Sequence, residues 1–173
     1  GGEIGRIASV ASFFVSRVDS KVDVRLQDIV RAEGEQAALA QSLLGKAAIA
    51  NARLAYDRFS EVFSSKRFEK LKLSLGAAQR PLWASTGTKN PAYPDTLYID
   101  SLIGPGTVNT VPDATLKAFL RRGRAVEATL AAAAGQAQAV LDRLRGEGFA
   151  LGKVSEGLLA DRLNSFTTPY CNR

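Results

Sequence analysis

The chain has 173 residues, of which 46% are hydrophobic and 23% are charged, and it carries a net charge of +6. This composition is ordinary for a soluble globular protein, and the length predicts a single domain. Histidine is absent and Cys171 is the only cysteine, which excludes a serine–histidine triad and a cysteine–histidine zinc site.

The termini, the apolar runs and the cysteine content bear on the expected cellular location of the protein. No apolar run approaches the roughly 20 residues of a membrane-spanning helix, and the N-terminus does not resemble a signal peptide. A lone thiol is typical of a reducing compartment, so we expect a cytoplasmic location. Methionine is absent even at position 1, so we expect the chain to be a processed product or a piece of a longer protein.

Residues 7–18 form the first predicted strand, because their apolar residues are almost continuous, as in a parallel strand covered on both faces. Helical spacing then predicts a helix up to Gly34 and a second helical stretch over 35–63. Ser65 is the predicted N-cap of a shorter helix that ends near Gly76.

Two further strands are predicted at 82–85, within the segment RPLWAS, and at 107–111. Between them, Asp95 is expected to cap a short helix, and GPG at 104–106 makes a turn. A helix over 113–120 and two or three alanine-rich helices up to Phe166 complete the chain. Strands that alternate with helices predict an α/β fold with a parallel sheet.

Polar side chains gather where the three predicted strands end, and this is where parallel α/β proteins bind ligands. Each of the first two ends combines hydroxyl groups with one cation, a chemistry that suits a phosphate or a polyhydroxylated ligand. The residues in question are Ser12, Ser16, Arg17 and Asp19; Ser85, Thr86, Thr88, Lys89 and Asn90; and Asn109 and Thr110.

From the residues alone, other interpretations stay open. Arg17 and Asp19 could equally form an ion pair with no ligand. The basic segment KAFLRRGR (117–124) fits a solvated helix end better than a nucleic-acid patch, because Phe119 is its only aromatic residue. Trp83, inside a predicted strand, fits the core better than a stacking platform.

Three long blocks resemble the C-terminal half of a transaldolase: SVASFFVSRVDSKVD, LGKAAIANARLAYDRF and QRPLWASTGTKNPAYPDTLYIDSLIGPGTVNTVPDATLKAF. The similarity is strongest to the long bacterial type, which also occurs fused to glucose-6-phosphate isomerase. It is dense over residues 7–123. The resemblance implies a (β/α)8 barrel, of which this chain would hold the last three strands with flanking and C-terminal helices as a single partial domain, 1–173.

The resemblance also implies an activity. Transaldolases transfer a dihydroxyacetone unit from sedoheptulose 7-phosphate to glyceraldehyde 3-phosphate through a lysine Schiff base, without a metal or an organic cofactor. The expected partners are therefore sugar phosphates, together with the N-terminal half of the barrel or a fused isomerase domain. Neither nucleic acid nor a membrane is expected as a partner.

Residue by residue, the family pattern places Ser12 beside the Schiff-base centre and Arg17 on the substrate phosphate. Ser85 matches the phosphate-binding serine of the next strand. The usual arginine two positions later is replaced by Gly87, so Lys89 is assigned to that role as a substitute.

The Schiff-base lysine of the family precedes the block that contains Ser12, and nothing in this chain matches it. A full barrel needs about 250 residues, so we expect a fragment that lacks the catalytic lysine and is inactive alone. The alternatives are a non-catalytic sugar-phosphate-binding module and, less favoured, a basic nucleic-acid-binding domain.

Overall fold

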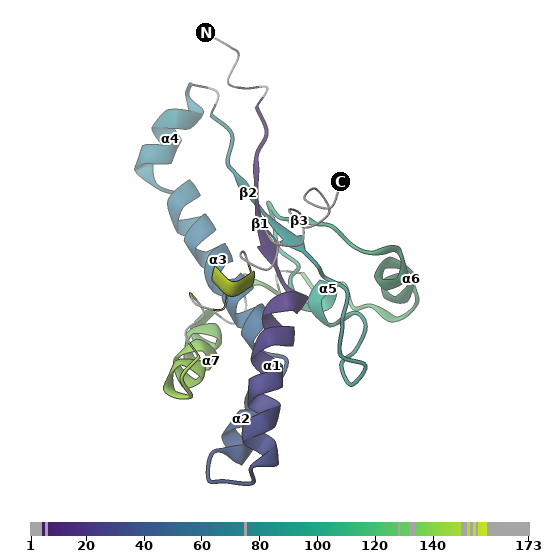
Figure 1. Ribbon diagram of the computed structural model, residues 1–173. Helices are drawn as coiled ribbons and strands as arrows, with labels where there is room; N and C mark the ends of the chain where they lie inside the picture. Colours follow the sequence, from purple (N-terminus) through teal and green to yellow (C-terminus); the bar gives the residue numbers. More distant parts are fainter. Residues whose placement is uncertain are drawn as a thin grey trace, which may run out of the picture.

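A computed structural model describes residues 5, 7–74, 76–127, 129–131 and 134–149, and also 152, 154 and 156–158. The chain alternates strands with helices, as its sequence predicts (Figure 1). The elements are β1 (Val10–Phe14), α1 (Ser16–Arg31), α2 (Ala37–Leu43), α3 (Ala47–Phe63), α4 (Lys66–Lys72), β2 (Arg80–Ala84), α5 (Leu97–Ser101), β3 (Val108–Asn109), α6 (Asp113–Arg122) and α7 (Ala134–Gly146).

The three strands form one parallel sheet in the order β1-β2-β3, which confirms the predicted α/β class. Ser12 lies opposite Leu82, and Trp83 lies opposite Asn109. The third strand is shorter than predicted, with two residues in place of the expected 107–111. The predicted α/β fold is therefore correct, while strand lengths are not.

The C-terminal boundary predicted for the first strand is wrong. Helix α1 begins at Ser16, so Arg17 and Asp19 lie in the first helical turn and not at the end of a strand. The physical reason is the spacing of Val15, Val18 and Val22, which are buried together on one side of the chain. The apolar run therefore contains a short strand and the start of a helix.

The expectation that the first strand is covered on both faces is also wrong. Val10 and Ser12 are exposed, whereas Phe13 packs on the opposite face against Trp83, with the ring centroids 5.7 Å apart. Trp83 is completely buried, which confirms its predicted place in the core. Within the described residues, Ser12 and Val10 therefore lie on an exposed side of β1, opposite the packed side that carries Phe13.

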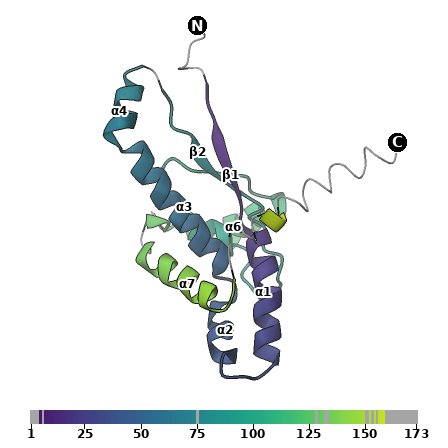
Figure 2. The ribbon, with the colours of Figure 1, turned by 60° about the vertical axis from the view of Figure 1, so that its left-hand side comes forward.

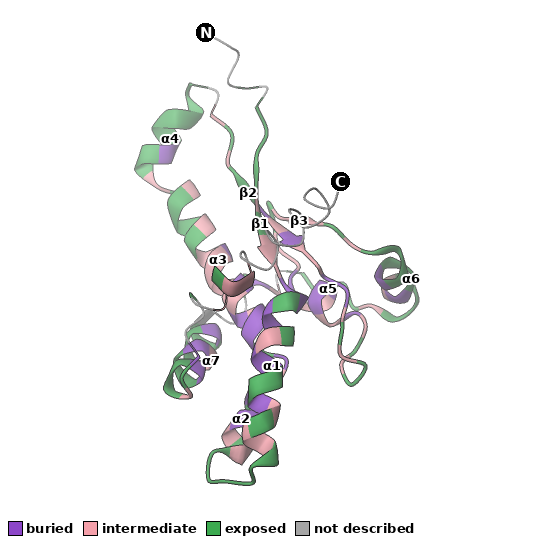
Figure 3. Cartoon of the chain, viewed as in Figure 1, coloured by how far each residue is buried: buried purple, intermediate pink, exposed green. Residues whose placement is uncertain are grey.

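The core lies on the packed face of the sheet and continues between the helices. In Figure 2, α3 and α7 run side by side, and α1 extends beyond the end of the sheet with α2 beside it. Figure 3 shows the buried residues concentrated where these helices meet, while α4 is mostly exposed. The largest buried aliphatic side chains are Leu26, Leu43, Leu130 and Leu144.

The long helix predicted over 35–63 is divided into α2 and α3 by a turn at 44–46. Gly45 makes this turn with φ +69°, a conformation that favours glycine. A Cβ atom at this position would lie 2.9 Å from Cζ of Tyr93. Gly45 is therefore required both by backbone conformation and by the close approach of Tyr93.

The predicted helix caps have mixed outcomes. The hydroxyl of Ser65 accepts a hydrogen bond from the Phe68 amide, which confirms the N-cap of α4. Asp95 does not cap α5, because it accepts hydrogen bonds from Arg122 of α6 instead. After Phe149 the structure describes only residues 152, 154 and 156–158. The helices predicted beyond α7 up to Phe166 therefore lie mostly outside the described residues, and the terminal SFTTPYCNR lies wholly outside them. No helix in the described ranges has both the length and the apolar character to cross a bilayer.

Two buried carboxylates of α1 hold the turn between α2 and α3. Asp19 accepts hydrogen bonds from the Ala48 amide at 2.8 Å and from the Tyr98 hydroxyl at 2.7 Å. Asp23, one turn later, accepts from the Gly45 amide at 3.0 Å and from the Tyr93 hydroxyl at 2.7 Å. Because α3 has no side-chain cap of its own, Asp19 satisfies an amide at its N-terminus and complements the positive end of its dipole.

Burial changes the titration of these groups. It raises the pKa of Asp19 to about 6, although the hydrogen bonds from Ala48 and Tyr98 oppose that change. Burial also raises the pKa of Asp23, opposed by its bonds from Gly45 and Tyr93. The pKa values of Tyr93 and Tyr98 are raised by burial and by the adjacent carboxylates, so both hydroxyls remain donors at neutral pH.

We predict that Asp19 makes the stability of the chain fall as the pH rises. The folded state holds the Asp19 proton up to about pH 6, whereas the unfolded chain releases it near its usual pKa of 3.8. The stabilisation is complete below pH 3.8 and lost as the pH passes through about 6. Relative to Asp19→Asn, the wild-type free energy of unfolding is expected to decrease by up to about 3 kcal/mol over this window. Urea unfolding at several pH values measures it.

The matched control for this titration is Asp28→Asn, which changes an exposed carboxylate of the same helix that pairs with Arg31. This control is expected to follow the pH dependence of the wild type. A wild-type curve parallel to that of Asp19→Asn between about pH 4 and pH 7 would contradict the assignment.

We also predict that Gly45→Ala destabilises the fold by about 1–3 kcal/mol, because alanine is strained at positive φ and its Cβ meets the Tyr93 ring. Thermal or urea unfolding measures the loss. Gly34→Ala is the control, because its Cβ would have no atom within 4 Å and its φ is not positive. Equal effects of the two substitutions would show that the turn at Gly45 is not constrained.

Candidate functional site

The C-terminal ends of β1 and β2 lie side by side and are joined by backbone hydrogen bonds. The Val15 amide donates to the Ala84 carbonyl at 2.9 Å, and the Ser16 amide donates to the Ser85 carbonyl at 3.0 Å. Ser85 itself has φ +57°, which is uncommon for a residue other than glycine. Backbone strain of this kind is concentrated at functional sites. The first two strand ends therefore meet at the start of α1, as expected.

Ser16, one of the polar residues expected at the end of the first strand, lies where the ends of β1 and β2 meet. It is 1% exposed, and its hydroxyl has no hydrogen-bond partner among the described residues. It is the first residue of α1, whose N-cap residue, Val15, provides no side-chain hydrogen bond. The hydroxyl oxygen is itself buried, so it is an unsatisfied group beneath the start of α1 and a ligand would not reach it directly.

Arg17 does not form the ion pair with Asp19 that was one of the open interpretations. The Asp19 carboxylate is buried and engaged by Ala48 and Tyr98, whereas Arg17 is exposed. The Arg17 guanidinium lies over the ring of Phe14, 5.1 Å from its centroid. The aromatic contact orients the cation beside the strand end and leaves its donors accessible to a ligand.

Lys89 borders an open cleft of about 320 Å³ next to the first turns of α1. This cleft contains both buried carboxylates and the tyrosines that bind them; its lining residues are Asp19, Ser20, Asp23, Val24, Gln27, Lys89, Asn90, Tyr93 and Tyr98. Lys89 is exposed. It lines the cleft together with Ser20, which follows Arg17 by three residues in α1. The cleft places Lys89 beside α1, whereas Arg17 and Ser85 do not line it.

The other polar residues at the strand ends have structural partners. The buried Thr86 hydroxyl donates to the Asn109 side chain at 2.8 Å, which ties the end of β2 to β3. Thr88 donates to the Pro94 carbonyl, and the Asn90 side chain accepts from the Ala92 amide. These bonds shape the loop that carries Lys89, so Thr86, Thr88, Asn90 and Asn109 are explained by the fold.

Ser12 lies apart from this group, within β1 and on the open face of the sheet. It does not line the cleft beside Asp19. The structure therefore brings Arg17 and Ser85 together with Ser16, places Lys89 at the adjacent cleft, and leaves Ser12 further down the strand.

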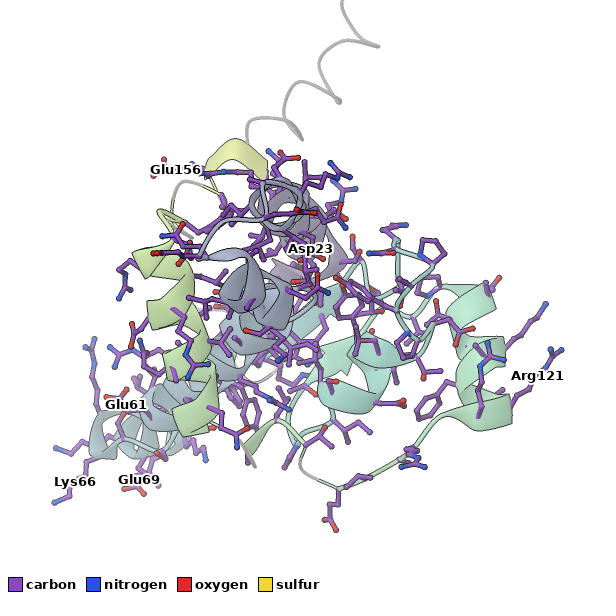
Figure 4. All side chains as sticks on the ribbon, turned by 90° about the horizontal axis from the view of Figure 1, so that it is seen from below. Asp23, Glu61, Lys66, Glu69, Arg121 and Glu156 are labelled. Atoms are coloured by element: carbon purple, nitrogen blue, oxygen red, sulfur yellow. The ribbon has the colours of Figure 1, made fainter. Side chains whose placement is uncertain are left out.

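Sequence analysis missed the cluster of Asp19, Asp23, Tyr93 and Tyr98. A signal was present, because two carboxylates four residues apart share one face of a helix. The misplaced strand boundary conceals it, since the predicted strand over 7–18 leaves Asp19 outside the helix that carries Asp23. Figure 4 labels Asp23 among the crowded side chains around α1, whereas Arg121 extends into solvent from α6. The basic end of α6 is thus a solvated helix end, with Arg122 paired to Asp95.

Comparison with known proteins identifies the family. The family model for transaldolase/fructose-6-phosphate aldolase matches residues 3–172. A transaldolase of Mycolicibacterium smegmatis is 48% identical over 166 residues, which is 96% of this chain and 43% of the relative. A transaldolase of Saccharopolyspora erythraea has the same identity and coverage. One from Renibacterium salmoninarum is 45% identical over 170 residues, which is 98% of this chain and 44% of the relative.

The chain therefore spans less than half the length of these relatives, while almost all of it is matched. The match includes both strand ends described above, the cleft beside Asp19 and the ten helices and strands found in the described residues. The chain belongs to the transaldolase/fructose-6-phosphate aldolase family.

Proposed function

We propose that this chain is part of a transaldolase and carries the phosphate-binding portion of its sugar-phosphate site. The observation that carries the proposal is the 48% identity to a transaldolase over 96% of the chain. The complete enzyme would transfer a dihydroxyacetone unit from sedoheptulose 7-phosphate to glyceraldehyde 3-phosphate, as part of the pentose phosphate pathway.

The proposed phosphate site consists of Arg17, Ser85 and Lys89. Arg17 provides a planar set of donors that suits phosphate oxygens, and Lys89 adds a second positive charge. The N-terminus of α1 supports the same role, because its positive end favours a negative charge at this point. Among the described residues no carboxylate is paired with Arg17, and the nearby Asp19 is buried and hydrogen-bonded elsewhere.

Ser12 is proposed to face the reacting carbon atoms of the sugar. Its position supports this role, because the open face of the sheet is where a ligand could extend from a phosphate held at the strand ends. In this arrangement the reacting carbons lie at β1 and the phosphate lies just beyond its end, and the two contacts are five positions apart in the sequence.

The lysine that forms the Schiff base is proposed to come from a part of the enzyme outside this chain. The chain spans 43% of its relative, and the sheet supports a partial barrel because β1 and β3 each have only one neighbouring strand in the described part. Unpaired strand edges are normally covered or continued by further strands. The open Ser12 face has the same explanation, since the interior of a barrel is closed by all of its strands.

We predict that this chain alone forms no Schiff base. Incubation with fructose 6-phosphate and borohydride, followed by intact mass analysis, is expected to leave its mass unchanged, because the required amine is absent. A complete transaldolase from one of the relatives is the positive control and should gain the mass of the reduced adduct. An adduct on one lysine of this chain would contradict the proposal and identify that lysine as the nucleophile.

We predict that Arg17→Gln weakens binding of fructose 6-phosphate about ten-fold or more, because a charge-assisted bond to the phosphate is lost. Calorimetry measures the affinity, and fructose tests whether the phosphate is required. The matched control is Arg31→Gln, an exposed arginine at the opposite end of α1 that should leave the affinity unchanged.

Three results of the same titrations would count against the proposed phosphate site: equal losses in both variants, binding of fructose as tight as that of its phosphate, or no binding by the wild type. Saturable binding of fructose 6-phosphate is expected for the proposed site and also for the alternative of a non-catalytic module, and a catalytic lysine encoded upstream of Gly1 would distinguish the two. Binding to DNA that weakens steeply with salt would instead favour the nucleic-acid hypothesis.

A further inference from the structure

A second cavity lies on the helical side of the chain, between α3, α5, α7 and the turn that joins α2 to α3. Its volume is about 450 Å³, within the range of small-molecule sites. The lining residues are Leu44, Gly45, Lys46, Ile49, Ala50, Arg53, Leu97, Ser101, Gln136, Ala137 and Val140. None of them lines the cleft beside Asp19, so the two sites are separate.

The guanidinium of Arg53 is the unusual group in this cavity. Its Nη2 donates to the Thr129 carbonyl at 3.3 Å, but its Nε is buried and has no hydrogen-bond partner in the described structure. Burial lowers the pKa of Arg53, yet arginine remains charged at neutral pH. A buried donor on a charged group without an acceptor is rare and indicates a missing water or anion.

The charges of the cavity have one sign. Lys46 is the other ionisable residue among the described lining residues, which include no acidic side chain. Asp57 follows Arg53 by one helical turn but makes no ion pair with it within the described residues. An anion would therefore meet two cations and no opposing carboxylate at the cavity wall.

The rest of the lining is mainly apolar. Ile49, Leu97 and Val140 provide hydrocarbon surface, while Ser101 and Gln136 add polar groups. Pockets that combine apolar walls with a few oriented polar groups are typical of sites for small organic ligands. A free inorganic ion would leave this hydrocarbon surface unused.

We propose that this cavity binds a small organic anion, in which a phosphate or carboxylate contacts Arg53 and Lys46 and an apolar group contacts Ile49 and Val140. Because Nε itself is buried, a small rotation of the guanidinium is needed for Nε to meet the anion, and the guanidinium can then hold two oxygens at once. The inference concerns the helical side of the chain and does not depend on the transaldolase activity.

The first test uses phenyl phosphate as the probe, with phenol and inorganic phosphate for comparison. Titrations are made in the Arg17→Gln, Lys89→Gln background, so that the proposed sugar-phosphate site does not contribute. Calorimetry is expected to show saturable binding of phenyl phosphate that is at least about ten-fold tighter than that of either part alone. In nitrogen-15 spectra, the Arg53 Nε–H resonance is expected to shift with the same affinity.

The second test changes the cavity. Arg53→Gln is expected to weaken phenyl phosphate binding about ten-fold or more, because it removes a charged hydrogen bond. Gln136→Glu introduces a negative charge at an exposed residue of the lining and should also weaken binding. Gln41→Glu makes the same charge change on an exposed residue outside the cavity and should have no effect.

Circular dichroism establishes whether each variant is folded. If Arg53→Gln is unfolded, the Arg53 resonance and the pair of glutamine variants decide the question. The proposal is overturned if phenyl phosphate does not bind saturably, if inorganic phosphate binds equally well, or if Gln136→Glu and Gln41→Glu behave alike.

Discussion

The buried carboxylates of Asp19 and Asp23 are the interaction on which the arrangement of this chain depends. Each carboxylate accepts one hydrogen bond from a backbone amide at or near the start of α3 and one from a tyrosine hydroxyl of the 88–98 segment. Three parts of the chain, separated by 22 to 79 residues, are thereby joined at one helix face. Burying a carboxylate is costly unless it is fully hydrogen-bonded, so loss of one partner affects the whole cluster.

The same interaction prepares the site at the strand ends. Because Asp19 is held by Ala48 and Tyr98, it is unavailable to Arg17, which stays exposed over Phe14. The tyrosines also anchor the loop on which Lys89 lies. Under the proposed function, Arg17 can then face a phosphate without pairing to Asp19, while Lys89 shares its cleft with both carboxylates.

The sheet divides the molecule into two sides with different chemistry. On one face, Phe13 and Trp83 pack into the core that continues between the helices, and the cavity at Arg53 lies on this helical side. On the other face, Ser12 is open. The chain spans less than half of its transaldolase relatives, and an uncovered face with unpaired edges is the arrangement expected where a sheet continues beyond the segment present.

Sequence alone determined the α/β class, the order of the elements, the core position of Trp83 and, through long matching blocks, the family. These properties follow from local spacing and residue type, which act between neighbours in the chain. Tertiary structure decided where the first strand ends, that the predicted long helix breaks at Gly45, and that Asp19 binds Tyr98 and not Arg17. Those outcomes depend on partners distant in sequence, whose hydrogen bonds and burial outweigh local preference. The unpartnered donor of Arg53 likewise became visible only when its surroundings were known.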